Sequence, residues 1–175
     1  LLSEAMDGSR FSGKKDQQAF IVLPKGSDAR RAVLIGAGKK DKRDARVLEG
    51  LGANLYKSHS GSGFKSLAVH AGSAEDAARI ALGAKLASYR FDTYFTKLKD
   101  DQKPSLESVT LVVSDVPAAE AAFVPLNAGA EGTKLARDLV NMPPNDLYPA
   151  SFAEKCRELG QYGVQVEVLG EAELA

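Results

Sequence analysis

The stretch LARDLVNMPPNDLYPASF, residues 135–152, decides how the chain is organised. An alanine-rich helical pattern covering residues 116–141 runs into it. Pro143 and Pro144 then stop the helix, because proline lacks the N–H group that continues helical hydrogen bonding. Pro149 suits the first turn of a new helix. The stretch therefore predicts a firm joint between two structural units.

Short runs rich in branched residues alternate with helical patterns along the rest of the chain. This alternation predicts an α/β fold, with a mostly parallel sheet flanked by helices. The first two strands are joined by a polar turn and could pair as a hairpin. The expected strands are residues 19–24, 32–36, 65–70, 108–114 and 164–169. The expected helices are residues 40–58, a helix opened by Ser73 that carries Ile80, Ala84, Ala87 and Phe91 on one face, residues 116–141, and a helix from Pro149 with Phe152, Cys156 and Leu159, closed by Gly163.

Three segments follow from this pattern. Residues 1–115 are expected to form an N-terminal α/β domain, residues 116–148 a connecting helix and proline-rich joint, and residues 149–175 the beginning of a second α/β domain. One strand and one helix cannot bury both of their faces alone, so the second domain is expected to continue beyond Ala175. The chain begins with Leu1 and not with Met, and it ends at Ala175 inside the helical pattern GEAELA. Both ends are therefore expected to be cut.

Composition excludes several classes of protein. The chain is 44% hydrophobic, which is enough for a packed core, and its 23 basic and 23 acidic residues give no net charge. Zero net charge argues against broad electrostatic binding to nucleic acid or to an anionic membrane. A single cysteine allows no disulfide framework and favours a reducing compartment. No apolar run reaches the length of a membrane span.

The side chains that could carry chemistry do not converge in the sequence. His59 and His70 have no acidic or cysteine partners at ligand spacing, whereas zinc needs three or four ligands. Asp100 and Asp101 lie between lysines in a polar loop, and we interpret them as solvated. Cys156 shares its helical stripe with Phe152 and Leu159, so we expect it to face the core and to be inert.

Two glycine-rich stretches, residues 35–40 and residues 60–64, could cradle a phosphate group. The first follows a strand and precedes a helix, which is the right context. It lacks the third glycine of a dinucleotide fingerprint and the GK[ST] ending of a P-loop, so Gly36 and Gly38 are interpreted as permitting a tight turn. The basic run of residues 39–46 has no aromatic residue and is interpreted as a solvated face. These residues alone predict no active site.

The combination of motifs resembles one family, the leucyl aminopeptidases of peptidase family M17. ARDLVNMPPNDLYPASFAE (residues 136–154) is similar to the segment that joins their two domains, where RDLVNTPPN-x-L-x-P is common. AVLIGAGKKD (residues 32–41), SYRFDTYFTKLK (residues 88–99) and GVQVEVLGEAEL (residues 163–174) resemble further family segments in the same order. Met142 departs mildly from the family pattern, and Pro125 is unexpected in the connecting helix.

The resemblance implies a macrodomain-like N-terminal domain followed by the start of a catalytic aminopeptidase domain. Enzymes of this family are cytosolic homohexamers that remove N-terminal amino acids from peptides with two divalent metal ions, such as zinc or manganese. Their metal ligands lie in the C-terminal domain, in motifs such as NTDAEGR, which this sequence lacks. The resemblance therefore assigns no catalytic, cofactor-binding or metal-binding residue to this chain. No membrane partner and no nucleic acid is expected.

The resemblance also gives the joint a role. Pro143 and Pro144 would fix the angle between the domains, and Asn141 and Asn145 would cap neighbouring backbone groups. Two alternatives stay open. One is a stand-alone macrodomain-like module that holds a phosphate or a nucleotide at residues 36–40, and the other is a regulatory module that contacts DNA.

Overall fold

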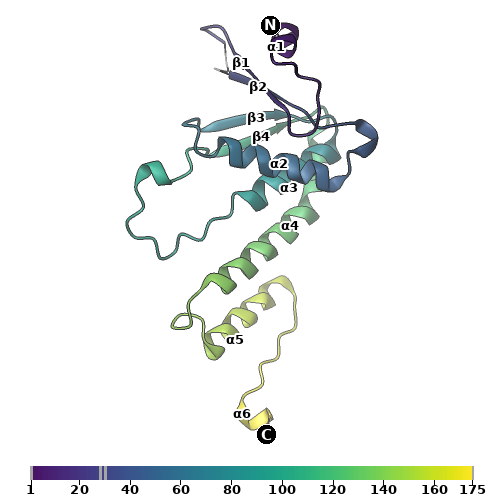
Figure 1. Cartoon of the computed structure of the whole chain (residues 1–175). Coiled ribbons are helices and arrows are strands. Elements are labelled where there is room, and N and C mark those ends of the chain that lie inside the picture. The colour runs from purple at the N-terminus through teal and green to yellow at the C-terminus, as the bar shows by residue number, and fades with distance from the viewer. Residues whose placement is uncertain (1, 28, 30, 175) are drawn as a thin grey trace. The chain divides into compact units, whose positions relative to one another are not determined.

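The computed structural model describes residues 2–27, 29 and 31–174 (Figure 1). The chain divides into two compact units, Leu1–Thr133 and Lys134–Ala175. Its elements are, in order, α1 (Leu2–Gly8), β1 (Gln18–Val22), β2 (Arg31–Ile35), η1 (Lys40–Lys42), α2 (Ala45–His59), β3 (Ser66–His70), α3 (Ala74–Ala87), η2 (Asp100–Gln102), β4 (Ser108–Val112), α4 (Val116–Asn141), α5 (Pro149–Arg157), η3 (Glu158–Tyr162) and α6 (Glu171–Leu174), where η marks a 3-10 helix.

The strands form two separate pairs. β1 and β2 are antiparallel, with Phe20 opposite Val33, which confirms the expected hairpin. β3 and β4 are parallel, with Val69 opposite Leu111. The mixed α/β class is confirmed, but within the described ranges the strands do not join into one mostly parallel sheet. The alternation of apolar and polar residues identifies a strand but not its neighbour in a sheet. Strand pairing depends on contacts between residues far apart in the chain.

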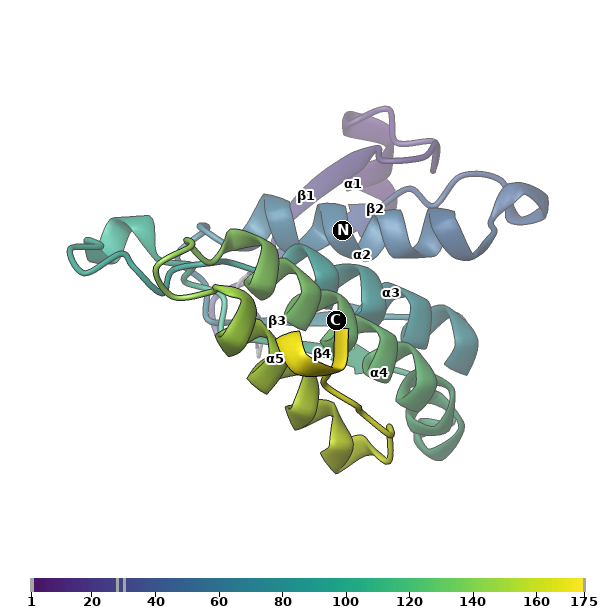
Figure 2. The same cartoon turned by 90° about the horizontal axis from the view of Figure 1, so that it is seen from below.

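The core of the first unit lies between two helices and the parallel strand pair. α2 and α3 run side by side, as both views of the chain show (Figures 1 and 2). Leu48 and Leu55 of α2 are buried with Ile80 of α3. Apolar side chains of the strands pack against them, including Leu67, Val69 and Leu111. The inward residues of β3 and β4 alternate with exposed ones, as expected for a sheet covered on one face.

Side chains mark where the central helices begin. The Ser73 hydroxyl accepts a hydrogen bond from the Asp76 N–H at 3.1 Å, which confirms the predicted start of α3. α2 begins at Ala45 rather than at residue 40, because the Asp44 carboxylate accepts from the Val47 N–H at 2.9 Å and caps the helix there. α3 ends at Ala87, so the prediction that Phe91 continues its face is wrong.

α4 is one helix over the predicted residues 116–141, with Pro125 inside it. Asp115 opens the helix by accepting a hydrogen bond from the Ala118 N–H at 3.0 Å. Pro125 therefore lies beyond the first turn, in the part of α4 that belongs to the first unit. Within the described residues, no helix of the chain is both long enough and apolar enough to cross a membrane.

The second unit contains α5, η3 and α6 after the end of α4. The left-handed conformation of Gly163, with a φ of 81°, ends η3 and confirms that this glycine closes the helical segment. The strand predicted at residues 164–169 does not form. A strand needs a ladder of backbone hydrogen bonds, and within the described residues no neighbour offers one to this segment, although its Val-rich alternation suits a strand.

Candidate functional site

The proline-rich joint has a defined backbone within the second unit. The Pro143 carbonyl accepts hydrogen bonds from the N–H groups of Asp146 and Leu147, at 3.0 and 2.9 Å. The Ser151 hydroxyl donates to the Asp146 carbonyl at 2.9 Å and accepts from the Tyr148 N–H at 2.9 Å. These bonds turn the chain sharply and open α5 at Pro149, as the sequence predicts.

The two asparagines of the joint behave differently. Asn141 donates from Nδ2 to the Arg137 carbonyl at 2.8 Å, so it caps a backbone group at the end of α4 as expected. Asn145 donates from Nδ2 to Oδ1 of the Asp146 side chain at 3.1 Å. The expectation that Asn145 caps the backbone is therefore wrong, because its amide donates to the neighbouring carboxylate, and a charged acceptor makes the stronger hydrogen bond.

The candidate metal ligands and the candidate nucleophile are kept apart. His59 is on the last turn of α2, where its Nδ1 lies 2.9 Å from the Leu55 carbonyl, and His70 is exposed at the end of β3. Across the described part of the chain, no three His, Cys, Asp or Glu side chains form a group that could hold a metal ion. Cys156 is half-buried on α5, a helix without a buried residue, so the prediction that it faces a core is wrong.

The glycine-rich turn after β2 is already filled by the chain itself. The Gly36 N–H donates to the Gln17 carbonyl at 2.8 Å, and the Gly38 N–H donates to the Gly13 carbonyl at 3.0 Å. A methyl group on Gly36 would overlap the Lys14 carbonyl oxygen. The turn interpretation is thus supported, and the two amides that a phosphate group would need are occupied.

The second glycine-rich stretch packs in a similar way against the segment before β4. The Gly63 N–H donates to the Ser105 hydroxyl at 2.9 Å, and the Ser60 carbonyl accepts from the Ser105 N–H at 2.7 Å. Next to it, Lys65 and Glu107 form an ion pair at 2.9 Å. The hydrogen bond to Glu107, then its charge, holds the pKa of Lys65 above its usual value.

The basic run and the acidic loop are on the surface. Residues 40–42 form η1 and are exposed, as a solvated segment should be. Asp100 belongs to η2 and accepts a hydrogen bond from Lys103 at 2.9 Å, which, with the charge of the lysine, lowers the pKa of Asp100. Neither segment brings a set of catalytic groups together.

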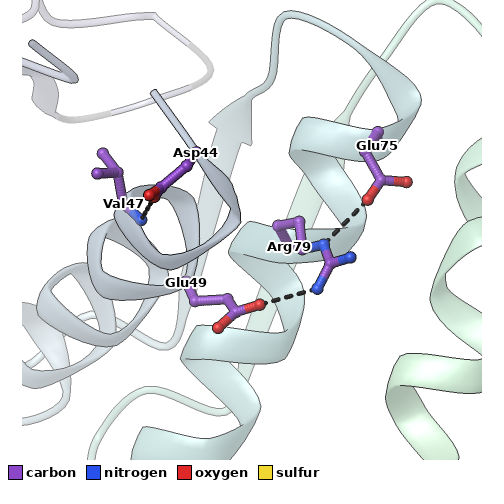
Figure 3. A network of polar contacts seen from close by, with 5 residues as sticks. All are labelled: Asp44, Val47, Glu49, Glu75 and Arg79. Atoms are coloured by element: carbon purple, nitrogen blue, oxygen red, sulfur yellow. Dashed lines mark hydrogen bonds and ion pairs between the residues drawn. The ribbon is translucent and has the colours of Figure 1, made fainter. Parts of the chain in front are cut away.

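A partly buried polar network connects α2 and α3 (Figure 3). Arg79 of α3 donates from Nε to Glu75 at 2.9 Å and from Nη1 to Glu49 of α2 at 3.0 Å. The hydrogen bond to Glu75, and then the one to Glu49, raise the pKa of Arg79 above its usual value. Both acceptors are already bound to one guanidinium, so this network holds the two helices together and leaves no carboxylate in place for proton transfer.

A cleft of about 430 Å³ opens between α3, the start of α4 and β4. Its polar groups include Tyr56, Lys85 and Glu107. Lys85 is engaged by Asn127 and Glu131 of α4. Because Lys85 is held by α4 and Glu107 is paired with Lys65, both charged groups of the lining are already engaged, and the cleft is suited to packing or binding.

Comparison with known proteins accounts for this arrangement. The family model described as the cytosol aminopeptidase family, N-terminal domain, matches residues 1–98 of the 175. The probable cytosol aminopeptidase of Caulobacter vibrioides is 40% identical over 99% of this chain and 36% of its own length. That of Rhodopseudomonas palustris (strain BisA53) is 42% identical over 96% of this chain and 35% of its own length.

Solved structures agree in fold. A tomato leucine aminopeptidase mutant superposes with a TM-score of 0.78 at 28% identity, covering 99% of this chain and 35% of that protein. The bottromycin maturation enzyme BotP in complex with Mn gives a TM-score of 0.73 at 26% identity, covering 97% of this chain and 36% of that protein. The chain thus spans about a third of the length of the relatives it matches. With the family model matching over half of it and relatives aligning along nearly all of it, the chain belongs to the cytosol aminopeptidase family, peptidase family M17, and represents its N-terminal domain.

Proposed function

We propose that this chain is the non-catalytic N-terminal portion of a metal-dependent leucyl aminopeptidase, where it supports assembly and positions the catalytic domain. One observation carries the proposal: nearly the whole chain aligns with only about a third of relatives named as aminopeptidases. The remaining two thirds of such a protein would bind the peptide and remove its N-terminal residue.

The metal chemistry belongs to that other part. The residues described here do not fit a two-metal centre, because they include no cluster of three or more metal-ligating side chains. The solved relative in complex with Mn indicates the kind of ion involved for that protein. In the full-length parent, two divalent ions such as zinc or manganese are expected to be bound outside the aligned segment.

The proposal extends to assembly and location. Relatives carry the name cytosol aminopeptidase, and we infer a cytoplasmic parent protein. The family resemblance supports a homohexamer with peptides as substrates. Pro143 and Pro144 would then fix the angle between the N-terminal domain and the catalytic domain, because both restrict the backbone where the turn begins.

The test compares the isolated chain with the full-length parent under identical conditions. Hydrolysis of leucine p-nitroanilide is measured for both proteins, with and without added Mn²⁺. We expect turnover from the full-length protein alone. Metal-dependent turnover by the purified 175-residue chain, abolished by a chelator, would overturn the assignment of a non-catalytic role.

The binding-module alternative is disfavoured by the occupied amides of Gly36 and Gly38. It can be tested by the thermal shift of the chain with ADP-ribose and nucleotides, since a ligand of the folded state raises the melting temperature. An unchanged melting temperature with all of these ligands would exclude the binding-module alternative. A DNA-contacting role would show as a salt-dependent gel shift.

A further inference from the structure

We propose that a small cavity between β2 and the loop after α2 binds a single phosphate group. The cavity measures about 80 Å³ and lies wholly within the first unit. Its polar lining consists of Arg31, His59, Ser62 and Ser66. This site is separate from the glycine-rich turn, and it does not depend on the proposed aminopeptidase role.

The size of the cavity limits what can enter. One buried water needs roughly 10–15 Å³ of such space, so about 80 Å³ holds more than one water. Pockets for cofactors and drug-sized ligands are about 300–1,000 Å³. The cavity therefore fits a small oxyanion with its hydration and is too small to enclose a nucleotide.

The charge of the lining favours an anion. Among the described residues that line the cavity, Arg31 is the only charged one and none carries a carboxylate. No ion pair or hydrogen bond among the described residues uses the Arg31 guanidinium. The closest acid in sequence to the lining, Glu107, is already paired with Lys65. A guanidinium offers five N–H donors in a fork that matches phosphate oxygens, and no side chain in the described ranges accepts a hydrogen bond from those of Arg31.

Arg31 is nevertheless held in place at the cavity. Its Cζ atom lies 5.3 Å from the centroid of the Phe64 ring, a distance at which a cation and an aromatic face attract each other. Arg31 and Val33 are two residues apart on β2, so they project from the same face of the strand toward the cavity. The backbone of β2 and the Phe64 ring thus position the Arg31 guanidinium at the cavity without a salt bridge to any described residue.

The last residue of α2 and the loop after it also line the cavity. His59 Nδ1 must be the donor to the Leu55 carbonyl at 2.9 Å, because a carbonyl only accepts. This bond leaves Nε2 as the ring nitrogen available to a ligand. The Ser62 hydroxyl donates to the His59 carbonyl at 2.7 Å, which fixes the loop and leaves the oxygen of Ser62 able to accept from a protonated phosphate oxygen.

The first experiment measures the melting temperature of the 175-residue chain in a phosphate-free buffer. Inorganic phosphate, phenyl phosphate and chloride are titrated at constant ionic strength. We expect a saturable rise of a few degrees with a phosphate group and none with chloride. A larger rise with inorganic phosphate identifies the free ion as the ligand, whereas an equal or larger rise with phenyl phosphate identifies a phosphomonoester. A response to phosphate no greater than the response to chloride overturns the proposal.

Two matched variants test whether the phosphate-dependent rise in melting temperature arises from binding at the cavity. Arg31→Gln should abolish the phosphate-dependent rise. Arg46→Gln removes an exposed arginine of α2 that does not line the cavity, and it should leave the rise unchanged. Equal loss in both variants, or no loss in Arg31→Gln, would contradict the site.

A second measurement does not depend on the folding of a variant. Amide resonances of the wild-type chain are followed by NMR while phosphate is added. The resonances of residues 31–33 and 62–67 should shift first and saturate together. Uniform small shifts along the whole chain, or shifts centred on the lysines of residues 39–42, would show non-specific screening and refute the site.

Discussion

Gly52 of α2 and Gly83 of α3 face each other's helix at the point of closest approach. A methyl group on Gly52 would overlap the Ile80 carbonyl oxygen, and one on Gly83 would overlap the Glu49 carbonyl oxygen. Both glycines are buried. The two backbones are therefore in direct contact, which is possible only because neither residue carries a side chain.

Gly52→Ala should destabilise the first unit. A methyl group at this position meets backbone atoms and cannot be relieved by a change of rotamer, and overpacking of this kind costs roughly 1–3 kcal/mol. Urea unfolding of the 175-residue chain measures the change in the free energy of unfolding.

Gly50→Ala is the matched control on the same helix. Apart from its chain neighbours and the backbone of its own helix, no described atom lies within 4 Å of the position that its methyl group would occupy. Alanine has the higher helix propensity by about 1 kcal/mol, so this variant should be at least as stable as the wild type. If Gly52→Ala were as stable as Gly50→Ala, the close contact between α2 and α3 would be disproved.

The pKa of Asp100 predicts a small dependence of stability on pH. The hydrogen bond from Lys103, and then the charge of Lys103, lower the pKa of this carboxyl below its usual value of 3.8. Because the folded-state pKa lies below the unfolded one, the pair stabilises the folded chain above the unfolded pKa. That contribution is lost as the pH falls through the folded-state pKa.

NMR titration of the Asp100 carboxyl carbon tests this directly. The midpoint should lie below 3.8 in the wild type and should rise in Lys103→Gln. Lys97→Gln, which removes another lysine of the same loop, should leave it unchanged. A midpoint insensitive to Lys103→Gln would exclude the ion pair in solution.

Amide hydrogen exchange should distinguish residues 164–169, which were predicted as a strand but do not form one, from the paired strand β3. Backbone N–H groups of residues 164–169 make no backbone hydrogen bond among the described residues, whereas those of β3 take part in the parallel pair with β4. In the 175-residue chain, residues 164–169 should exchange at rates close to those of an unfolded peptide, and β3 should be protected. Comparable protection in both segments would show that residues 164–169 are paired.

The joint gives a prediction for the full-length parent. Replacing Pro143 and Pro144 together by glycine frees the backbone at the start of the turn that the Pro143 carbonyl organises. We expect weaker assembly and lower peptidase activity, measured by light scattering and by leucine p-nitroanilide hydrolysis. Pro117→Gly, at the start of α4, is the control. If the double variant assembled and hydrolysed the substrate like the wild type, the proposed role of the joint would be contradicted.

Local chemistry made much of the fold predictable. Ser73 announces α3 because a hydroxyl in front of a helical pattern can take an orphan amide. Pro143 and Gly163 end their helices for equally local reasons, a missing N–H group in one case and a left-handed conformation in the other. These features need no knowledge of distant residues.

Contacts between distant residues were not predictable in this way. Glu75 and Arg79 are one helical turn apart and could have been paired from spacing alone, but Glu49 joins the same guanidinium from 30 positions away. Arg31 and His59 meet at one cavity only because β2 and the end of α2 are brought together by the core. The strand predicted at residues 164–169 failed for the converse reason: its pattern suits a strand, but no strand among the described residues pairs with it.

The segment that fills the turn after β2 has a practical consequence for expression of this domain. Residues 13–17 supply the carbonyl acceptors for Gly36 and Gly38, and Asp16 accepts a further hydrogen bond from Asn54 of α2 at 2.9 Å. A domain boundary chosen at Gln18, where the first strand begins, would remove these partners and leave two backbone amides without acceptors. Such a shortened domain is expected to be less stable than the intact chain, because the buried amide of Gly36 would lose its acceptor.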